Sequence, residues 1–218
     1  MKKRYRIITS AVFIITLTWV IWGVFVFGSQ NVTGHASSVA IVGLTILGNC
    51  NQQINLTSGW NFISFYSIPS NNSIDSVLSP IAGSYDYLQE WDPISQSFKV
   101  WSIYGTKQFT QFNQNMSYFV RITSVTSLDV NGNCFENLTM NLSSGWESPA
   151  YIYDYPANIS GTSFKNISFT YIQKWNASSQ SFLAYSIYAL SNPFNSINAS
   201  EGYFIWTTGG QLVYIKGG

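Results

Sequence analysis

Residues 85–104 read YDYLQEWDPISQSFKVWSIY, and residues 169–188 read FTYIQKWNASSQSFLAYSIY. Ten of these twenty positions are identical at an offset of 84 residues. Upstream, LTSGW at residues 56–60 is matched by LSSGW at 142–146, and downstream YFV at 118–120 is matched by YFI at 203–205. The chain therefore contains two copies of one unit.

Each copy consists of short runs rich in aromatic and β-branched residues, separated by Gly, Asn, Ser and Pro. Residues 87–91 alternate bulky with polar side chains, 95–97 suit a turn, and 98–101 resume the pattern, which predicts a hairpin with one buried face. Brief helices are expected only at residues 74–78 and near Phe164. The sequence predicts an all-β fold of two tandem homologous β-sandwich-like domains.

The composition divides the chain into four parts: a signal peptide or membrane anchor at residues 1–29, an N-terminal extension at 30–48, β repeat 1 at 49–132 and β repeat 2 at 133–218. A basic cluster precedes residues 7–27, which carry no charge and could span a bilayer. This length suits a retained anchor, whereas the small residues Gly28, Gly34 and Ala36 suit signal-peptide cleavage. Under either interpretation, only this segment meets the membrane and the remainder is extracellular or on the cell surface.

Charge is scarce, with ten Lys or Arg against nine Asp or Glu in 218 residues. So few cations argue against a nucleic-acid partner. The only His is His35, near the predicted mature start, and no zinc-ligand set is present. We therefore expect no catalytic site, no metal site and no cofactor.

One group of carboxylates occurs in the first copy, at Asp86, Glu90 and Asp92. The second copy has Thr, Lys and Asn at the matching positions, so the two copies cannot share an acid–base or calcium site. We expect these carboxylates to lie on a solvated turn. After loss of the leader, six cations face nine carboxylates, and so few ionisable groups predict a flat dependence of stability on pH.

Asn-x-Ser/Thr sites are more than twice as frequent as the roughly four that the composition predicts by chance. Such sites permit N-linked glycosylation in an exported chain, so we expect glycans on its surface. The ten candidate sites are Asn31, Asn55, Asn71, Asn115, Asn137, Asn141, Asn158, Asn166, Asn176 and Asn198.

The two cysteines, Cys50 and Cys134, occupy equivalent places, each in a Gly-Asn-Cys sequence. In an exported protein such a pair suggests a disulfide, although two free or intermolecular thiols are the alternative.

Residues 44–48 resemble the closing segments of the two copies, at 128–132 and 212–217, yet no copy precedes them. This leading segment belongs to a run that is apolar on both alternating faces, so both faces must be covered. Either it folds back to complete its own chain, or it is donated to the sheet edge of a neighbouring subunit. The candidate donor strand comprises Val39, Ala40, Ile41, Val42, Leu44, Ile46 and Leu47.

This layout of leader, apolar N-terminal strand and glycosylated β head resembles the archaeal thread pili. That resemblance implies a head built like a chaperone–usher pilin and a head-to-tail homopolymer that forms a surface filament. Residues 59–64 (GWNFIS) also resemble the GWN-x-IS repeats of microbial surface proteins, although GWESP at 145–149 departs from the pattern after the Trp. The alternative is a non-polymerising secreted or membrane-anchored surface glycoprotein, with a carbohydrate-binding or surface-layer role.

Aromatic residues recur at matched places in the two copies. The simplest interpretation is a repeated core, and the alternative is an exposed platform on which sugars stack. A platform would leave at least two coplanar aromatic rings exposed, whereas a core would bury nearly all of them. The matched pairs are Trp91/Trp175, Trp101/Tyr185, Tyr104/Tyr188 and Tyr118/Tyr203.

Overall fold

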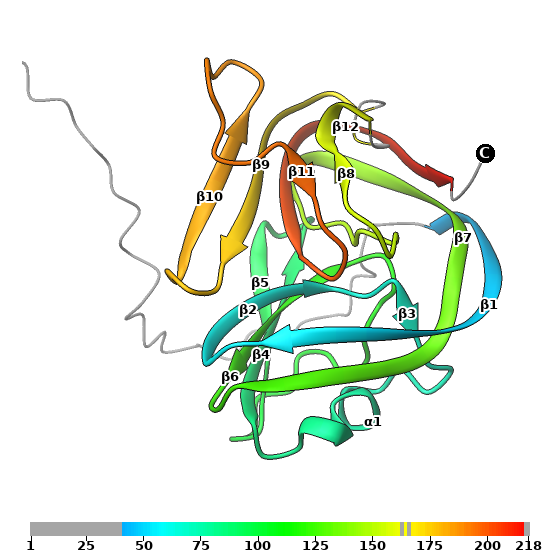
Figure 1. The fold of residues 1–218 in the computed structure, drawn as a ribbon, viewed down its shortest axis with the longest axis vertical. Helices are drawn as coiled ribbons and strands as arrows, with labels where there is room; N and C mark the ends of the chain where they lie inside the picture. Colours follow the sequence, from blue (N-terminus) through cyan, green and yellow to red (C-terminus); the bar gives the residue numbers. More distant parts are fainter. Residues whose placement is uncertain (1–40, 162–163, 165–166, 216–218) are drawn as a thin grey trace, which may run out of the picture. The chain divides into compact units, whose positions relative to one another are not determined.

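A computed structural model describes residues 41–161, 164 and 167–215 of the chain, and only the backbone of residues 41–47, 161 and 215 (Figure 1). No helix in this part of the chain is long and apolar enough to cross a membrane. The predicted leader at residues 1–29 and most of the extension lie outside the described residues, as do Asn31, Val39, Ala40 and Asn166.

The first copy forms a four-stranded antiparallel sheet in the order β2-β6-β4-β5. Its strands are β2 (Gly59–Ser64), β4 (Tyr85–Asp92), β5 (Ser97–Ser102) and β6 (Ser117–Ile122). Strands β4 and β5 form the predicted hairpin, and Gln96 in its turn has a φ of 51°.

The second sheet runs in the order β1-β7-β12-β9-β10, and β3 (Ser67–Ile68) also pairs with β7. Its strands are β1 (Ile41–Leu56), β7 (Thr126–Glu147), β9 (Phe169–Asn176), β10 (Ser181–Ser186) and β12 (Tyr203–Ile215). Smaller elements are α1 (Ile74–Val77), the 3₁₀ turns η1 (Ser79–Ile81) and η2 (Ile159–Gly161), and the pair β8 (Ala157–Asn158) with β11 (Ser196–Ile197).

The internal repeat is visible in the strand order. The last four strands of the second sheet, β7-β12-β9-β10, correspond in sequence to β2-β6-β4-β5 of the first. The β9–β10 turn even repeats the left-handed glutamine of the first hairpin, because Gln180 also has a φ of 51°. The predicted all-β, sandwich-like fold is confirmed, and the predicted short helix at residues 74–78 is present as α1.

The two copies share one body. The predicted domain boundary between residues 132 and 133 lies inside the continuous strand β7, and the described residues form a single compact unit. One hydrophobic cluster includes Leu88 and Val120 of the first copy with Ile172 and Ile205 of the second. A division into two tandem domains is therefore not confirmed.

A second, aromatic cluster joins the two sheets. Phe62 and Phe119 of the first sheet stack at 4.2 Å between ring centroids, and Phe204 of the second sheet stacks on Phe62 at 4.9 Å. All three rings are buried. Such stacks contribute about 0.5–1.5 kcal/mol per pair beyond area burial, so this cluster helps to hold the copies together.

Around this cluster the copies exchange the same hydrogen bonds in both directions. Trp91 Nε1 of the first copy donates to the main-chain oxygen of Trp146 in the second, at 2.8 Å. Trp175 Nε1 of the second copy donates to the main-chain oxygen of Trp60 in the first, at 2.7 Å. The two contacts are equivalent under the repeat, so each hairpin anchors the opening strand of the other copy.

The turn glutamines complete this exchange and explain the repeated Gly-Trp pairs. Gln180 Oε1 accepts a hydrogen bond from the main-chain N–H of Trp60, which follows Gly59, at 2.8 Å. Gln96 Oε1 accepts one from the main-chain N–H of Trp146, which follows Gly145, at 3.0 Å. A Cβ at Gly59 would lie 2.8 Å from the Gln180 side chain, and one at Gly145 would lie 3.0 Å from that of Gln96. Both glycines have positive φ, so close approach and backbone conformation each require glycine there.

Candidate functional site

Strand β1 has two halves that pair differently with β7. Residues 48–56 lie opposite residues 126–134 in one uninterrupted antiparallel register. Residues 41–46 lie opposite 135–140, and that stretch holds three register shifts, between Ile41 and Gly43, Thr45 and Ile46, and Ile46 and Gly48. Because a register shift leaves ladder groups unpaired, the N-terminal half is the less regular of the two.

This N-terminal half also lies at the edge of its sheet. Strand β1 ends the strand order, so its backbone pairs with β7 on one side and with no other described strand. Exposed strand edges can accept or exchange strands, which makes this edge a candidate assembly site. The predicted donor residues whose backbone lies in the strand are Ile41, Val42, Leu44, Ile46 and Leu47.

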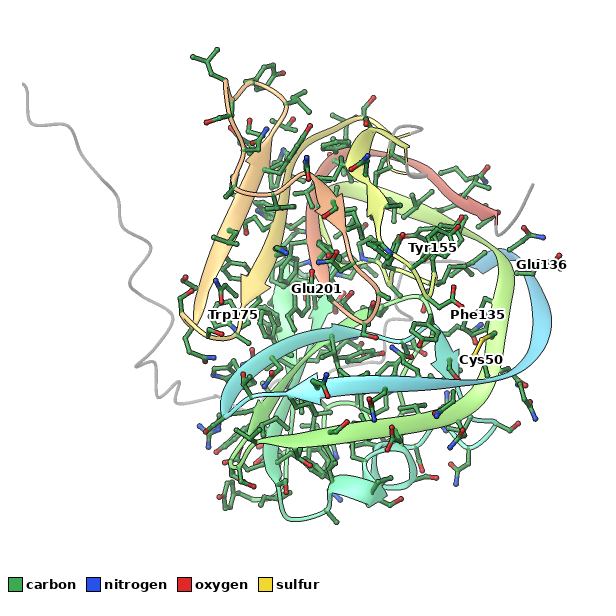
Figure 2. All side chains as sticks on the ribbon, in the orientation of Figure 1. Cys50, Phe135, Glu136, Tyr155, Trp175 and Glu201 are labelled. Carbon is green, nitrogen blue, oxygen red and sulfur yellow. A yellow bond between two sulfur atoms is a disulfide. The ribbon has the colours of Figure 1, made fainter. Side chains whose placement is uncertain are left out.

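A glycine with positive φ and a disulfide follow directly after residues 41–47 in the chain. Gly48 has a φ of +128°, and a Cβ placed there would meet nothing within 4 Å. The predicted disulfide between Cys50 and Cys134 is confirmed, with the Cα atoms 5.7 Å apart, and it appears beside the Cys50 label in Figure 2. At this point Asn49 faces its own repeat equivalent, Asn133. The half of β1 after Gly48 is therefore held to β7 by the disulfide and the uninterrupted register, whatever the position of residues 41–47.

The part of β7 opposite residues 41–47 belongs to the core. Phe135, Leu138 and Met140 are each at most 1% exposed. Asn137 Oδ1 is buried without a hydrogen-bond partner among the described residues. This edge of β7 therefore has to stay covered by a strand, and the sequence alone did not show which segment covers it.

The predicted carboxylate turn is wrong for Asp86 and Glu90, which are 5% and 3% exposed. Alternation along β4 places both on one inward face, and partners compensate their charge. Arg121 binds Asp86 with two nitrogens, one of them at 2.7 Å. Lys99 lies 3.9 Å from Glu90 and 3.4 Å from Asp92. Burial nevertheless raises the pKa of Glu90. In the described part of the chain no group of three metal-ligating side chains exists.

A third buried carboxylate, Glu147, occupies the position in the second copy that Asn61 has in the first. The Asn61 amide accepts from the Thr57 N–H at 3.0 Å and donates to the Thr57 and Gly59 oxygens at 2.7 and 3.1 Å. Glu147 Oε1 accepts from the Ser143 N–H at 2.6 Å, but its Oε2 is buried without a partner among the described residues. Burial raises the pKa of Glu147 to about 7.

The recurring aromatics divide between core and surface. Tyr118, Tyr203 and Trp101 are 0–3% exposed, as expected of a repeated core. Tyr104 and Tyr188, at equivalent places beyond β5 and β10, are instead 71% and 77% exposed. Exposure of one pair at two loop tips matches neither a fully buried core nor a single flat platform.

The candidate glycosylation sites differ in accessibility. Asn55 and Asn141, which are equivalent under the repeat, are exposed, as are Asn71 and Asn158. Asn115 is only 6% exposed, so the folded chain hides its amide from modification. The other described sites, at intermediate exposure, are Asn137, Asn176 and Asn198.

Comparison with known proteins gives no further constraint on these features. No protein-family model, curated protein or solved structure matches the chain.

Proposed function

We propose that the protein is a structural subunit of an extracellular, glycosylated filament. Its subunits assemble head to tail by strand exchange. Residues 41–47 of one subunit take the place of the same residues beside β7 of the next subunit. The partner is thus a second copy of this chain, and the reaction is strand exchange without chemistry.

The observation that carries the proposal is the contrast within β1. Its N-terminal half is apolar, lies at a sheet edge, pairs irregularly, and joins the fixed half at Gly48. Exchange between identical copies keeps the same strand pairs, so it costs little beyond the entropy of association and is favoured by high local concentration. The buried edge of β7 stays covered in either state.

Open growth follows because the two surfaces that meet are different. The donated segment and the accepting strand are different parts of the chain, so the contact is heterologous and need not close. The disulfide ties the base of the donated strand to β7 of its own subunit, so tension along a filament passes through a covalent link.

The test uses register partners on two separate chains. Thr45 lies opposite Asn137, so one preparation carries T45C and the other carries N137C. After export, mixing, assembly and mild oxidation, we expect disulfide-linked species larger than the monomer that disappear on reduction. Electron microscopy of the same samples should show fibres.

The regular half of β1 supplies the matched control. Gln53 lies opposite Asp129, with their side chains 3.1 Å apart, and this pairing stays within one chain under the proposal. A mixture of Q53C and D129C chains should therefore remain monomeric on non-reducing gels. A chain that carries both T45C and N137C shows whether the two cysteines can pair within one molecule. If that chain forms the internal disulfide while the mixture of single variants stays monomeric, residues 41–47 fold back permanently. The alternative of a non-polymerising surface glycoprotein then holds.

A further inference from the structure

A cleft of about 710 Å³ lies between the edge strand β1 and the turn end of the β9–β10 hairpin. This volume is within the range of small-molecule sites in proteins. One wall includes Gln53 and Asn55 of β1, and the opposite wall includes Lys174, Trp175 and Asn176 at the end of β9. Figure 2 labels Trp175 near the turn of this hairpin and Glu201, which also lines the cleft, near the start of β12.

Three aromatic side chains line the cleft, and two of them, Trp175 and Tyr66, are partly exposed. Trp175 is held rigidly, because its Nε1 donates to the Trp60 oxygen at 2.7 Å and its ring meets Phe182 edge-on at 4.9 Å. Tyr66 makes no ring-to-ring contact with any described aromatic residue, and its hydroxyl donates to the Asn51 oxygen at 3.3 Å. Partly exposed rings of this kind suit the apolar C–H faces of a sugar.

The polar groups of the cleft are placed by a fixed network. Glu201 Oε2 accepts from Lys174 Nζ at 3.3 Å, from Asn198 Nδ2 at 3.0 Å and from the Tyr203 hydroxyl at 2.5 Å. Three donors on one oxygen orient the carboxylate and leave Oε1 to accept from a ligand. Asn176 uses its Oδ1 for the Ser178 N–H at 3.0 Å, which leaves its Nδ2 as a donor.

The charge of the cleft disfavours an anionic ligand. Among its lining residues Lys174, Asp154 and Glu201 are charged, and the lysine is already paired with the glutamate. No unpaired cation remains there to hold an anion. The lining is also too polar for the apolar run at residues 39–47, so the donor strand of a neighbouring subunit does not fit it.

The repeat shows that this arrangement is particular to the second copy. At the positions of Lys174, Asn176 and Glu201 the first copy has Glu, Asp and Met. These substitutions leave the strand order unchanged, so the polar groups that the second copy supplies to the cleft are not repeated at the matching positions of the first copy.

We propose that this cleft binds a neutral oligosaccharide from outside the chain, stacked on Trp175 and Tyr66 and hydrogen-bonded by the amides and the Glu201 carboxylate. This inference is independent of strand exchange, and it would make an assembled filament adhesive. Two predicted glycosylation sites, Asn55 and Asn176, line the cleft, so the chain's own glycan is the competing source of the same chemistry.

The experiment uses the full exported chain and three probes: chitotetraose, cellotetraose and maltotetraose. A T57A/S178A variant keeps both asparagines but removes the glycosylation signals at Asn55 and Asn176. Titration followed by tryptophan fluorescence and calorimetry should show saturable binding of at least one probe, both to this variant and to the unaltered chain. Binding to the variant alone would assign the cleft to the chain's own glycan and overturn the proposal.

Two further variants locate the binding. Y66A should weaken it by about tenfold, the loss expected for one aromatic contact, and A177W should abolish it by filling the cleft. Matched controls lie outside the cleft: Y104A removes an exposed tyrosine, and I94W adds the same ring to the turn of the other hairpin. Both controls should bind as the parent does. Failure of all three probes, or equal losses in the controls, would overturn the proposal.

Discussion

The two copies of the repeat agree where they hold each other and differ at individual polar positions, both buried and in the cleft. Trp91 and Trp175 make the same cross-copy hydrogen bond at 2.8 and 2.7 Å. By contrast, Asn61 in one copy is Glu147 in the other, and a hydrogen-bonded amide becomes a carboxylate with an unpaired oxygen. The shared contacts explain why one body forms from two copies. The differences show where each copy is free to acquire a property of its own.

The largest expected effect tests whether the copies are one cooperative unit. The Cys50–Cys134 disulfide joins equivalent positions of the two copies across 84 residues. A C50S/C134S variant should lose about 4–5 kcal/mol of unfolding free energy, because its unfolded chain gains loop entropy. Urea unfolding monitored by tryptophan fluorescence and by circular dichroism should show one coincident transition in both proteins. Two separate transitions would mean that the copies are independent domains.

The next largest effect tests the difference between Asn61 and Glu147 through the dependence of stability on pH. Burial raises the pKa of Glu147 to about 7 from an ordinary value of 4.5, so the folded state binds a proton that the unfolded state releases between these pH values. Stability should therefore fall by about 3 kcal/mol as the pH rises from 4.5 to above 7. The neutral carboxylic acid can donate a hydrogen bond, as the Asn61 amide does. Burial also raises the pKa of Glu90, which acts in the same direction.

Urea titrations at pH 4.5, 6 and 8 measure this dependence. E147Q supplies a permanent amide and should remove most of the loss at high pH, whereas E136Q, half-buried on the same strand, should leave it in place. A parent protein equally stable at all three pH values would contradict the assignment. It would instead support the flat dependence that the low charge count alone predicts.

Particular residues show how far sequence reasoning reaches in this protein. The hairpins and the all-β class follow from local patterns, because alternation and turn residues act over a few positions. The disulfide was predicted from two cysteines at equivalent places of the repeat. The fusion of the copies does not follow from such patterns, since repetition predicts which strands form without specifying their neighbours. Asp86 and Glu90 were misplaced because alternation alone does not show which face of β4 points inward, and because their partners Arg121 and Lys99 come from other strands.

The saccharide cleft also escaped prediction, because its walls come from β1 and β9, more than a hundred residues apart in the chain. Trp175 was predicted only as one of a repeated aromatic pair, in either a core or a sugar-stacking platform. Tyr66 and Glu201 have no aromatic or acidic counterpart in the other copy. Sites that are assembled between copies leave no periodic signal in either copy alone.

The smallest effect separates what the two copies share from what they do not. W91F and W175F each remove one cross-copy N–H donor and part of a ring, while a turn glutamine still donates to the same carbonyl at 3.1 Å. Each should cost about 1–2 kcal/mol, and the two costs should agree within about 0.5 kcal/mol. Because Trp175 lines the cleft and Trp91 does not, W175F should also weaken oligosaccharide binding, whereas W91F should not. Unequal stabilities would show that the cross-copy contacts are not equivalent, and equal losses of binding would remove Trp175 from the site.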